Sequence, residues 1–268
     1  MSELVRYEVA GPVATVSLDS PKNRNALSAQ LMAELLDGLA KARDDDAVRV
    51  VVLGHEGPVF CAGADLKESA GTTGSSGSSD SRGSADIPVA TLPAVLQALC
   101  ESPKPVIARV AGPARAGGIG LLAACDIAVV GDDATFAFTE VRLGVVPAVI
   151  SAVVLPRLAP QAAHELFLTG EVFTGDRAAQ IGLVNRSVPD YEIDEVVKGY
   201  VDMLMRGAPG ALAATKALLR RTQNPVSADD FAELSALSVR HFGSAEGREG
   251  MAAFAEKRNP SWVPPSTR

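Results

Sequence analysis

The sequence lacks the cysteine pattern that a disulfide framework or a zinc knuckle requires. Its 268 residues include three cysteines, an odd number, and no two of them form a C-x-x-C pair. The sequence also lacks a basic excess, because 25 lysines and arginines face 32 aspartates and glutamates and give a formal net charge of −7. We therefore expect a protein of a reducing compartment, and the acidic balance disfavours nucleic acid as a partner.

Long apolar segments are missing as well. No stretch reaches the roughly 18 uninterrupted apolar residues that a membrane span requires, and residues 1–3 do not begin a basic and then apolar signal segment. We expect a soluble, cytoplasmic protein with no membrane partner. Hydrophobic residues make up 47% and charged residues 21% of the chain, which is ordinary for a globular protein and excludes global disorder.

Short apolar runs alternate with helical patterns in the first half of the chain. Residues 4–9 and 13–18 are β-branched runs separated by Gly11 and Pro12, which indicates a hairpin. Ser28 precedes leucines at helical spacing and is a candidate N-cap. Further apolar runs, each typical of a strand buried on both faces, span residues 48–53, 106–110 and 127–130. This order predicts an α/β fold with right-handed crossovers.

From about residue 150 onward the patterns are almost all helical, with one short strand at 184–188. The helical patterns span residues 158–168, 176–181, 192–205, 210–221, 229–242 and 246–257. We divide the chain into a core of residues 1–195 and a helical C-terminal region of residues 196–268. The apolar positions of this region must pack on the core or on another chain, among them Leu212, Leu218 and Leu219.

Residues 69–85 are rich in glycine and serine and hold no apolar residue larger than alanine. Such a segment cannot bury enough surface to offset its ordering entropy, so we predict a flexible loop. It is either a tolerated surface insertion or a mobile flap over a ligand site.

Two turns of small residues stand at the ends of predicted strands. Residues 60–67 read Phe-Cys-Ala-Gly-Ala-Asp-Leu-Lys, and residues 111–120 follow the strand at 106–110 and should open a helix. In each turn backbone N–H groups have no side chain in the way. Two such donors, brought together, could hold an anionic oxygen, which accelerates reactions that pass through enolates or tetrahedral intermediates.

Two other interpretations of the second turn stay open on the residues alone. Residues 118–123 fit the alanine-ending variant of the dinucleotide-binding fingerprint, with Glu140 about 20 positions further on, although that fingerprint belongs near a first βαβ unit. The turn could also be a helix packed closely against a strand, with no ligand.

Taken together, these segments resemble the crotonase (enoyl-CoA hydratase/isomerase) superfamily. The resemblance rests on residues 60–67, 111–126 and 135–147, with further matches at residues 21–27, 168–171, 178–184 and 253–258. It implies a crotonase-like core, a spiral of ββα turns, and a helical C-terminal region that drives assembly into a trimer or a hexamer. It also implies an acyl-CoA thioester as substrate, with coenzyme A as part of that substrate and with neither a separate cofactor nor a metal.

The resemblance also assigns roles to individual residues. The N–H groups of Ala64 and Gly117 match the family's oxyanion hole, which would bind the thioester oxygen and stabilise an enolate. Glu140 matches one of the family's acid/base carboxylates. The other matches concern substrate binding, largely around the adenine and phosphates of coenzyme A: Lys22, Arg24, Ala62, Asp65, Leu66, Gly118, and, from a neighbouring subunit, Phe254 and Lys257.

One position departs from the family's pattern. Hydratases of the family usually carry another glutamate three residues after the oxyanion glycine, where this chain has Gly120. Syn hydration asks for one group that activates water and one that protonates Cα. Glu140 must therefore do both, or another carboxylate must substitute, and the candidates that border the flexible loop are Glu68, Asp80 and Asp86.

Three functions fit this departure. Residues 139–148 are closest to family members with glycine at the position of Gly120 that look like hydratases of branched acyl-CoAs, which favours a hydro-lyase that adds water to a 2-enoyl-CoA. A single carboxylate also resembles the Δ3-Δ2-enoyl-CoA isomerases. The loss of one acid/base group would also fit a non-catalytic acyl-CoA binder.

The remaining polar residues receive no part in the chemistry. Arg115 could pair with a substrate carboxylate, but we expect it to be solvated or to face another subunit. Asp65 is expected to cap a helix. The histidines are scattered without metal-ligand spacing, and we expect surface or core positions for all of them: His55, His164 and His241.

Overall fold

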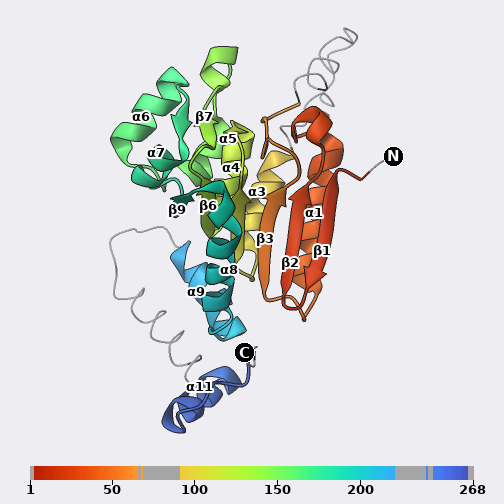
Figure 1. Ribbon diagram of the computed structural model, residues 1–268, viewed down its shortest axis with the longest axis vertical. Coiled ribbons are helices and arrows are strands. Elements are labelled where there is room, and N and C mark those ends of the chain that lie inside the picture. Colours follow the sequence, from red (N-terminus) through yellow and green to blue (C-terminus); the bar gives the residue numbers. More distant parts are fainter. Residues whose placement is uncertain (1–2, 66–67, 69–90, 221–239, 241–243, 265–268) are drawn as a thin grey trace.

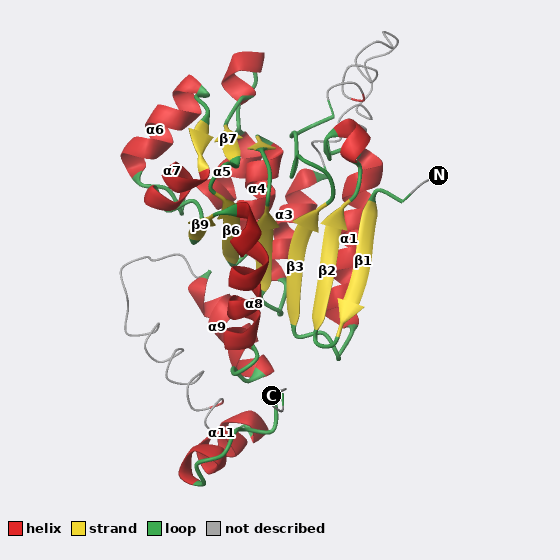
Figure 2. Ribbon diagram, viewed as in Figure 1, coloured by secondary structure: helices red, strands yellow, loops and turns green. Residues whose placement is uncertain are grey.

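The computed structural model describes residues 3–65, 68, 91–220, 240 and 244–264. Within these residues the fold has a larger and a smaller β-sheet with helices packed around them (Figures 1 and 2). The glycine- and serine-rich segment 69–85 and, apart from residue 240, the predicted helix at 229–242 lie outside the described part.

The larger sheet has six strands in the order β1-β2-β3-β4-β6-β9. The first two strands form the predicted antiparallel hairpin, and the later neighbours all pair in parallel. The strands are β1 (Val5–Ala10), β2 (Val13–Leu18), β3 (Val50–His55), β4 (Val106–Val110), β6 (Ile127–Gly131) and β9 (Arg186–Val188). Parallel neighbours place the carboxyl ends of β2, β3, β4, β6 and β9 at one edge of the sheet, where connecting loops carry function in many α/β folds.

Both faces of the larger sheet are covered, which explains the continuous apolar runs of β3, β4 and β6. Alternate residues of β3 point to opposite faces, so that Val51 and Leu53 join the main core while Val50 and Val52 join a second cluster. The main core lies between the sheet and helices α1 (Ala29–Asp44) and α3 (Leu92–Glu101). Helix α8 (Ile193–Leu204) covers the second cluster.

The smaller sheet joins β5 (Ala114–Arg115), β7 (Thr135–Ala137) and β8 (Phe173–Thr174). Strand β5 pairs in parallel with β7, and an isolated bridge ties Cys61 to Ala114 of β5. A second bridge joins Leu27 to Ala64. These short pairings connect the two small-residue turns of the sequence to one another and to the segment before α1.

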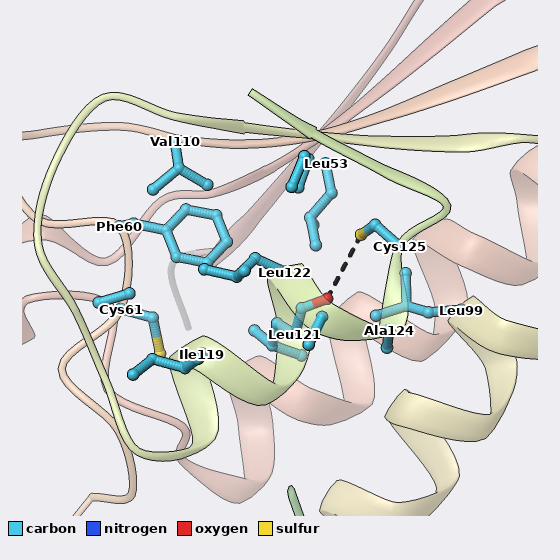
Figure 3. Packing of buried hydrophobic residues seen from close by; sticks show 14 of the residues in the cluster. Leu53, Phe60, Cys61, Leu99, Val110, Ile119, Leu121, Leu122, Ala124 and Cys125 are labelled. Carbon is cyan, nitrogen blue, oxygen red and sulfur yellow. Dashed lines mark hydrogen bonds between the residues drawn. The ribbon is translucent and has the colours of Figure 1, made fainter. Parts of the chain in front are cut away.

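Helix α4 (Gly117–Ala124) is the most deeply placed helix, because all eight of its residues are buried. Its side chains pack against the ends of the strands: Leu121 and Leu122 lie with Phe60, Val110 and Leu53 (Figure 3). The Cys125 thiol, just after the helix, donates a hydrogen bond to the Leu121 carbonyl at 3.3 Å. A helix that is apolar on every side can exist in water only if it is enclosed in this way.

The remaining helices confirm most of the predicted helical pattern. They are α5 (Ala148–Val154), α6 (Pro160–Thr169), α7 (Gly175–Gln180), α9 (Pro209–Leu219) and α11 (Ala245–Ala255), with 3₁₀ turns η1 (Pro21–Asn23), η3 (Glu140–Leu143) and η4 (Asp190–Glu192). Ser28 caps α1 as predicted, since its side chain accepts a hydrogen bond from the Leu31 N–H at 3.2 Å. None of the helices in the described residues combines the length and apolar character that a membrane crossing needs.

A buried lysine fastens helix α9 to the core. The Lys216 ammonium group is 2.6 Å from the Asp126 carboxylate and also donates hydrogen bonds to the carbonyls of Leu99 and Lys104. Other α9 side chains are less well covered: Leu218 and Leu219 are exposed. Part of the apolar surface of α9 is therefore not covered by any described residue of the chain.

Replacement of Lys216 by methionine should lower the free energy of unfolding by about 2 kcal/mol, because the half-buried Asp126 carboxylate loses its charged partner and keeps only the Val106 N–H, and the Leu99 and Lys104 carbonyls lose a donor. Urea denaturation measures the change. The matched control is Lys198→Met, since Lys198 pairs with Asp202 on the exposed surface of α8 and should contribute less than about 1 kcal/mol. Equal losses for both variants would contradict the anchoring role.

Candidate active site

A cavity of about 470 Å³ lies where the N-terminal ends of α1, α3 and α4 approach η3 and α5. Two of its lining residues have polar side chains, Thr139 and Glu140, and the others are apolar. The described lining comprises Leu27, Met32, Ala62, Ala64, Leu92, Ala116, Gly117, Thr139, Glu140, Leu143, Val145, Val146, Pro147, Ala148, Val149 and Ile150. Apolar walls with few convergent polar groups are typical of ligand sites.

Both predicted oxyanion residues line this cavity. Within the described residues, neither the Ala64 N–H nor the Gly117 N–H donates a hydrogen bond, and Gly117 is the first residue of α4, where a helix leaves its N–H groups unpaired. The two turns touch, because a Cβ built on Gly63 would lie 3.2 Å from both the Arg115 carbonyl oxygen and the Ala116 Cβ. Two unpaired donors therefore stand on adjoining turns beside one cavity.

A strained residue stands directly before the second donor. Ala116 has φ 48° and ψ −117°, a left-handed conformation that favours glycine. Its carbonyl accepts hydrogen bonds from Ile119 and Gly120 at the start of α4, and its N–H donates to Ala137. These bonds hold the strained peptide that joins Ala116 to the Gly117 N–H. Strain of this kind is concentrated at functional sites.

Asn25 fixes the segment that leads into the first turn by hydrogen bonds from its side chain. It is fully buried, and its side-chain amide donates to the carbonyls of Glu56 and Val59 while its oxygen accepts from the Ser20 N–H at 2.7 Å. Backbone bonds continue the attachment: Leu27 N–H donates to the Gly63 carbonyl at 2.8 Å. The turn that carries Ala64 is thus fixed by the segment that precedes α1.

Glu140 is the one ionisable side chain among the described lining residues. It begins η3, and its Oε2 atom is buried with no hydrogen-bond partner in the described structure. Burial in apolar surroundings raises the pKa of Glu140 above its ordinary value, 4.5, because desolvation disfavours the charged form. A half-buried carboxyl with an unused oxygen and a raised pKa is suited to exchange a proton with a ligand.

Ile150 fills the space over Gly120. A Cβ built on Gly120 would lie 2.6 Å from Ile150 Cγ2 and 3.6 Å from Leu96 Cδ2. Ile150 is almost fully buried and comes from α5, which packs against α4. A longer side chain at position 120 would therefore require Ile150 to move, and the described cavity has hydrocarbon where a second carboxylate would stand.

A model of the enoyl-CoA hydratase/isomerase family matches residues 8–264. The chain belongs to this family. A Thermus thermophilus protein that carries the provisional name enoyl-CoA hydratase is 37% identical, covering 93% of this chain and 97% of the relative. The carnitinyl-CoA dehydratase of Salmonella arizonae is 33% identical over 98% of this chain and 99% of its own. The solved enoyl-CoA hydratase of Mycobacterium smegmatis has 32% identity and a TM-score of 0.87, with 97% of this chain and 99% of that chain covered.

Family membership confirms the expected crotonase fold and an enzyme of the hydratase/isomerase kind. The fold is therefore not a dinucleotide-binding fold, and residues 118–123 are not its fingerprint. Gly118 has instead a packing reason to be glycine, since a Cβ there would lie 2.8 Å from the Cys61 Cβ. Burial raises the pKa of the Cys61 thiol to about 12, so this cysteine stays protonated beside the site.

The residues expected to contact coenzyme A are only partly brought together. Ala62 lines the cavity, and its N–H donates a hydrogen bond to the Arg24 carbonyl. The side chains of Lys22 and Arg24 are exposed nearby in the chain. Lys257 is exposed just after α11, which lies at the opposite end of the molecule from α4 and α5 (Figure 1). Leu66 and the side chain of Phe254 lie outside the described residues.

The candidates for a second carboxylate do not supply one in the described structure. Glu68 accepts a hydrogen bond from the Ala29 N–H, at the start of α1. Asp65 accepts from the Glu68 N–H, which is the capping contact that we expected, and from the Asn23 side chain. Asp80 and Asp86 lie outside the described residues.

Arg115 is bound within the chain more closely than a solvated side chain would be. This side chain is half-buried, and its guanidinium donates hydrogen bonds to the carbonyl and hydroxyl oxygens of Thr135. Its guanidinium thus ties β5 to β7, which makes it less available to a substrate carboxylate, and the contact of its exposed part with another subunit stays a prediction. His164 is exposed as expected, His55 is half-buried at the end of β3, and His241 lies outside the described residues.

Replacement of Glu140 by glutamine should lower kcat by about 10²-fold or more, because the amide cannot exchange a proton with a substrate. Steady-state kinetics with a 2-enoyl-CoA measures the loss, and the exposed Glu171→Gln serves as control. In the wild type, the raised pKa places the acid limb of kcat/KM above pH 4.5, with the rate falling as the pH falls through that pKa and the carboxylate is protonated. A Glu140→Gln variant of undiminished kcat would contradict the assignment.

Replacement of Gly120 by glutamate should lower the free energy of unfolding by about 2 kcal/mol through overpacking against Ile150. The second change Ile150→Ala should recover part of this loss, so that the double variant is more stable than additivity predicts. Urea denaturation of the three variants gives the coupling. Gly199→Glu is the matched control, since a Cβ on Gly199 of α8 meets nothing within 4 Å. Strict additivity would contradict the contact.

Proposed function

We propose that this protein is a hydro-lyase that adds water across the double bond of a 2-enoyl-CoA thioester, with coenzyme A as part of the substrate and no separate cofactor. The observation that carries the proposal is the meeting of two unpaired backbone N–H groups and one carboxyl, with an unpartnered oxygen, beside a single apolar cavity. The N–H groups of Ala64 and Gly117 would receive the thioester carbonyl oxygen. Negative charge grows on that oxygen during addition, so fixed donors stabilise the transition state more than the substrate.

Glu140 alone would carry the proton in this reaction. As a carboxylate it takes one proton from a water molecule while the water oxygen bonds to Cβ, and the electron pair of the double bond moves to the thioester oxygen as an enolate. As a carboxylic acid it then returns a proton to Cα and becomes a carboxylate again. A group that must serve as both base and acid works best with a pKa near the working pH, and the raised pKa of Glu140 is in that direction.

One observation favours a second candidate, a Δ3-Δ2-enoyl-CoA isomerase. Ile150 occupies the space over Gly120 and leaves Glu140 as the sole described carboxyl of the cavity. An isomerase needs one base, which removes a proton from C2 of a 3-enoyl-CoA and returns it to C4 of the dienolate. The same oxyanion donors would stabilise that dienolate, so the two functions differ in whether water enters.

The C-terminal helices support a proposal about assembly. Helix α11 lies at the opposite end of the molecule from α4 and α5 (Figure 1), which contribute Gly117 and Ile150 to the cavity, so Lys257, just after α11, would reach a thioester in a neighbouring copy. Exposed Leu218 and Leu219 offer apolar surface for such a contact. We therefore propose that the chain assembles with copies of itself, as a trimer or a hexamer.

A panel of enoyl-CoA thioesters in H₂¹⁸O tests the two functions. We expect the absorbance of 2-enoyl-CoA thioesters to fall and one ¹⁸O atom to appear at Cβ of a 3-hydroxyacyl-CoA. Conversion of a 3-enoyl-CoA to a 2-enoyl-CoA without ¹⁸O uptake would replace the hydratase by the isomerase. No conversion of straight or branched thioesters in either direction would contradict both.

A further inference from the structure

His55 occupies a position common to both oxyanion turns. It is the last residue of β3 and stands five positions before the start of the first turn, residues 60–67, which carries Ala64. Its Nε2 atom accepts a hydrogen bond of 3.0 Å from the N–H of Ala111, the first residue after β4 and the start of the second turn, which leads to Gly117. One side chain therefore joins the origins of the two turns.

The His55 ring is held as a neutral hydrogen-bond acceptor. Burial, with a smaller contribution from the charge of Arg109, lowers its pKa to about 4, so Nε2 carries a lone pair at neutral pH. A neutral imidazole with Nε2 as acceptor has its proton on Nδ1. That Nδ1 atom is buried and makes no hydrogen bond of good geometry, although backbone groups of Glu56, Gly57 and Val59 lie close enough to oppose the fall in pKa. The imidazole and the Phe60 ring are nearly perpendicular, with 5.5 Å between their centroids.

The incomplete hydrogen bonding of this Nδ1–H is informative. A phenyl ring could fill the same space against Phe60 without burying a poorly bonded donor, and burial of such a donor costs free energy. The part of the imidazole that makes a specific contact is Nε2, and its partner is the Ala111 N–H. The chemistry of the position therefore points to that bond and not to ring packing alone.

The Ala111 bond is the first of a ladder between the turns. After it, the Pro113 carbonyl accepts from the N–H groups of Phe60 and Cys61, and the Arg115 N–H donates to the Cys61 carbonyl at 3.0 Å. Gly112 lies so close to the Pro58 carbonyl that a Cβ on Gly112 would overlap it. A displacement at Ala111 would thus be transmitted along the ladder to the oxyanion donors.

We propose that His55 is a positioning residue: its Nε2–Ala111 hydrogen bond sets the register of the two turns and thereby the separation of the Ala64 and Gly117 donors. The inference rests on the proposed function for its effect on catalysis, but the register itself does not depend on which thioester is the substrate. Because a donor misplaced by about 1 Å can cost 10²-fold in rate, a small shift suffices for a measurable effect.

Three substitutions separate the acceptor from the ring. His55→Gln places an amide oxygen near the position of Nε2 and keeps an acceptor within reach of Ala111. His55→Asn is polar but one bond shorter, and its oxygen corresponds to Nδ1. His55→Phe keeps the ring and its edge contact but has no acceptor. We expect kcat to fall by about tenfold or more in His55→Phe and His55→Asn with KM nearly unchanged, and His55→Gln to stay close to wild type.

A bound 2,4-dienoyl-CoA supplies a readout that needs no turnover. Hydrogen bonds to the thioester oxygen polarise the conjugated chain and shift its absorbance to longer wavelength. We expect the shift to shrink in His55→Phe and His55→Asn at saturating ligand and to persist in His55→Gln. Amide hydrogen exchange within residues 111–120 should accelerate in the same two variants.

The outcomes are distinct. Wild-type kcat and absorbance shift in His55→Phe, or equal losses in all three variants, would overturn the positioning role. A change confined to thermal stability would also overturn it, because it would make His55 a packing residue. Absence of turnover in the wild type, together with the expected pattern of absorbance shifts, would contradict the proposed hydration and leave the positioning role supported.

Discussion

The backbone of residues 58–63 runs against the backbone of residues 112–118 at separations that leave no room for most side chains. A Cβ on Gly112 would overlap the Pro58 carbonyl, and one on Gly118 would lie 2.8 Å from both the carbonyl oxygen and the Cβ of Cys61. Close approach of two main chains is what lets amides from two distant segments stand beside one cavity. The ladder of backbone hydrogen bonds, the bridge from Cys61 to Ala114 and the entry into α4 all depend on it.

The same packing sets the electrostatics of the cavity. Helix α4 is enclosed by apolar side chains on every side, and Ile150 of α5 extends that hydrocarbon surface over Gly120 to the cavity wall. Glu140 consequently faces few dipoles, and desolvation is the largest cause of its raised pKa. In a site with two carboxylates, charge repulsion would raise one of the two pKa values. Here the apolar wall raises the pKa of a single carboxyl, that of Glu140, by desolvation.

The sequence was sufficient for the features that depend on local pattern. The order of strands and helices and the Ser28 cap could be predicted from local pattern, whereas Ala64, Gly117 and Glu140 were named only by the resemblance to the family, and all three line the cavity. What the sequence could not predict depends on contacts across the fold. Ile150 meets Gly120 through the packing of α5 on α4, and Arg115 finds Thr135 through the pairing of β5 with β7. The sequence gives no sign that His55 differs from the other two histidines, because its partner, the Ala111 N–H, is 56 residues away in the chain.

Arg115 also bears on what the cavity can hold. With its guanidinium committed to Thr135, the described wall contains no cationic side chain, and its one ionisable group is Glu140. A carboxylate on the acyl group would meet no counter-charge from these residues and would lie near Glu140, which is itself a carboxylate when it acts as base, and this repulsion opposes binding. A hydrocarbon chain would instead exchange water for contact with Leu143, Val146 and Ile150, and burial of apolar surface is favourable. The described cavity wall thus matches an uncharged acyl group better than a charged one.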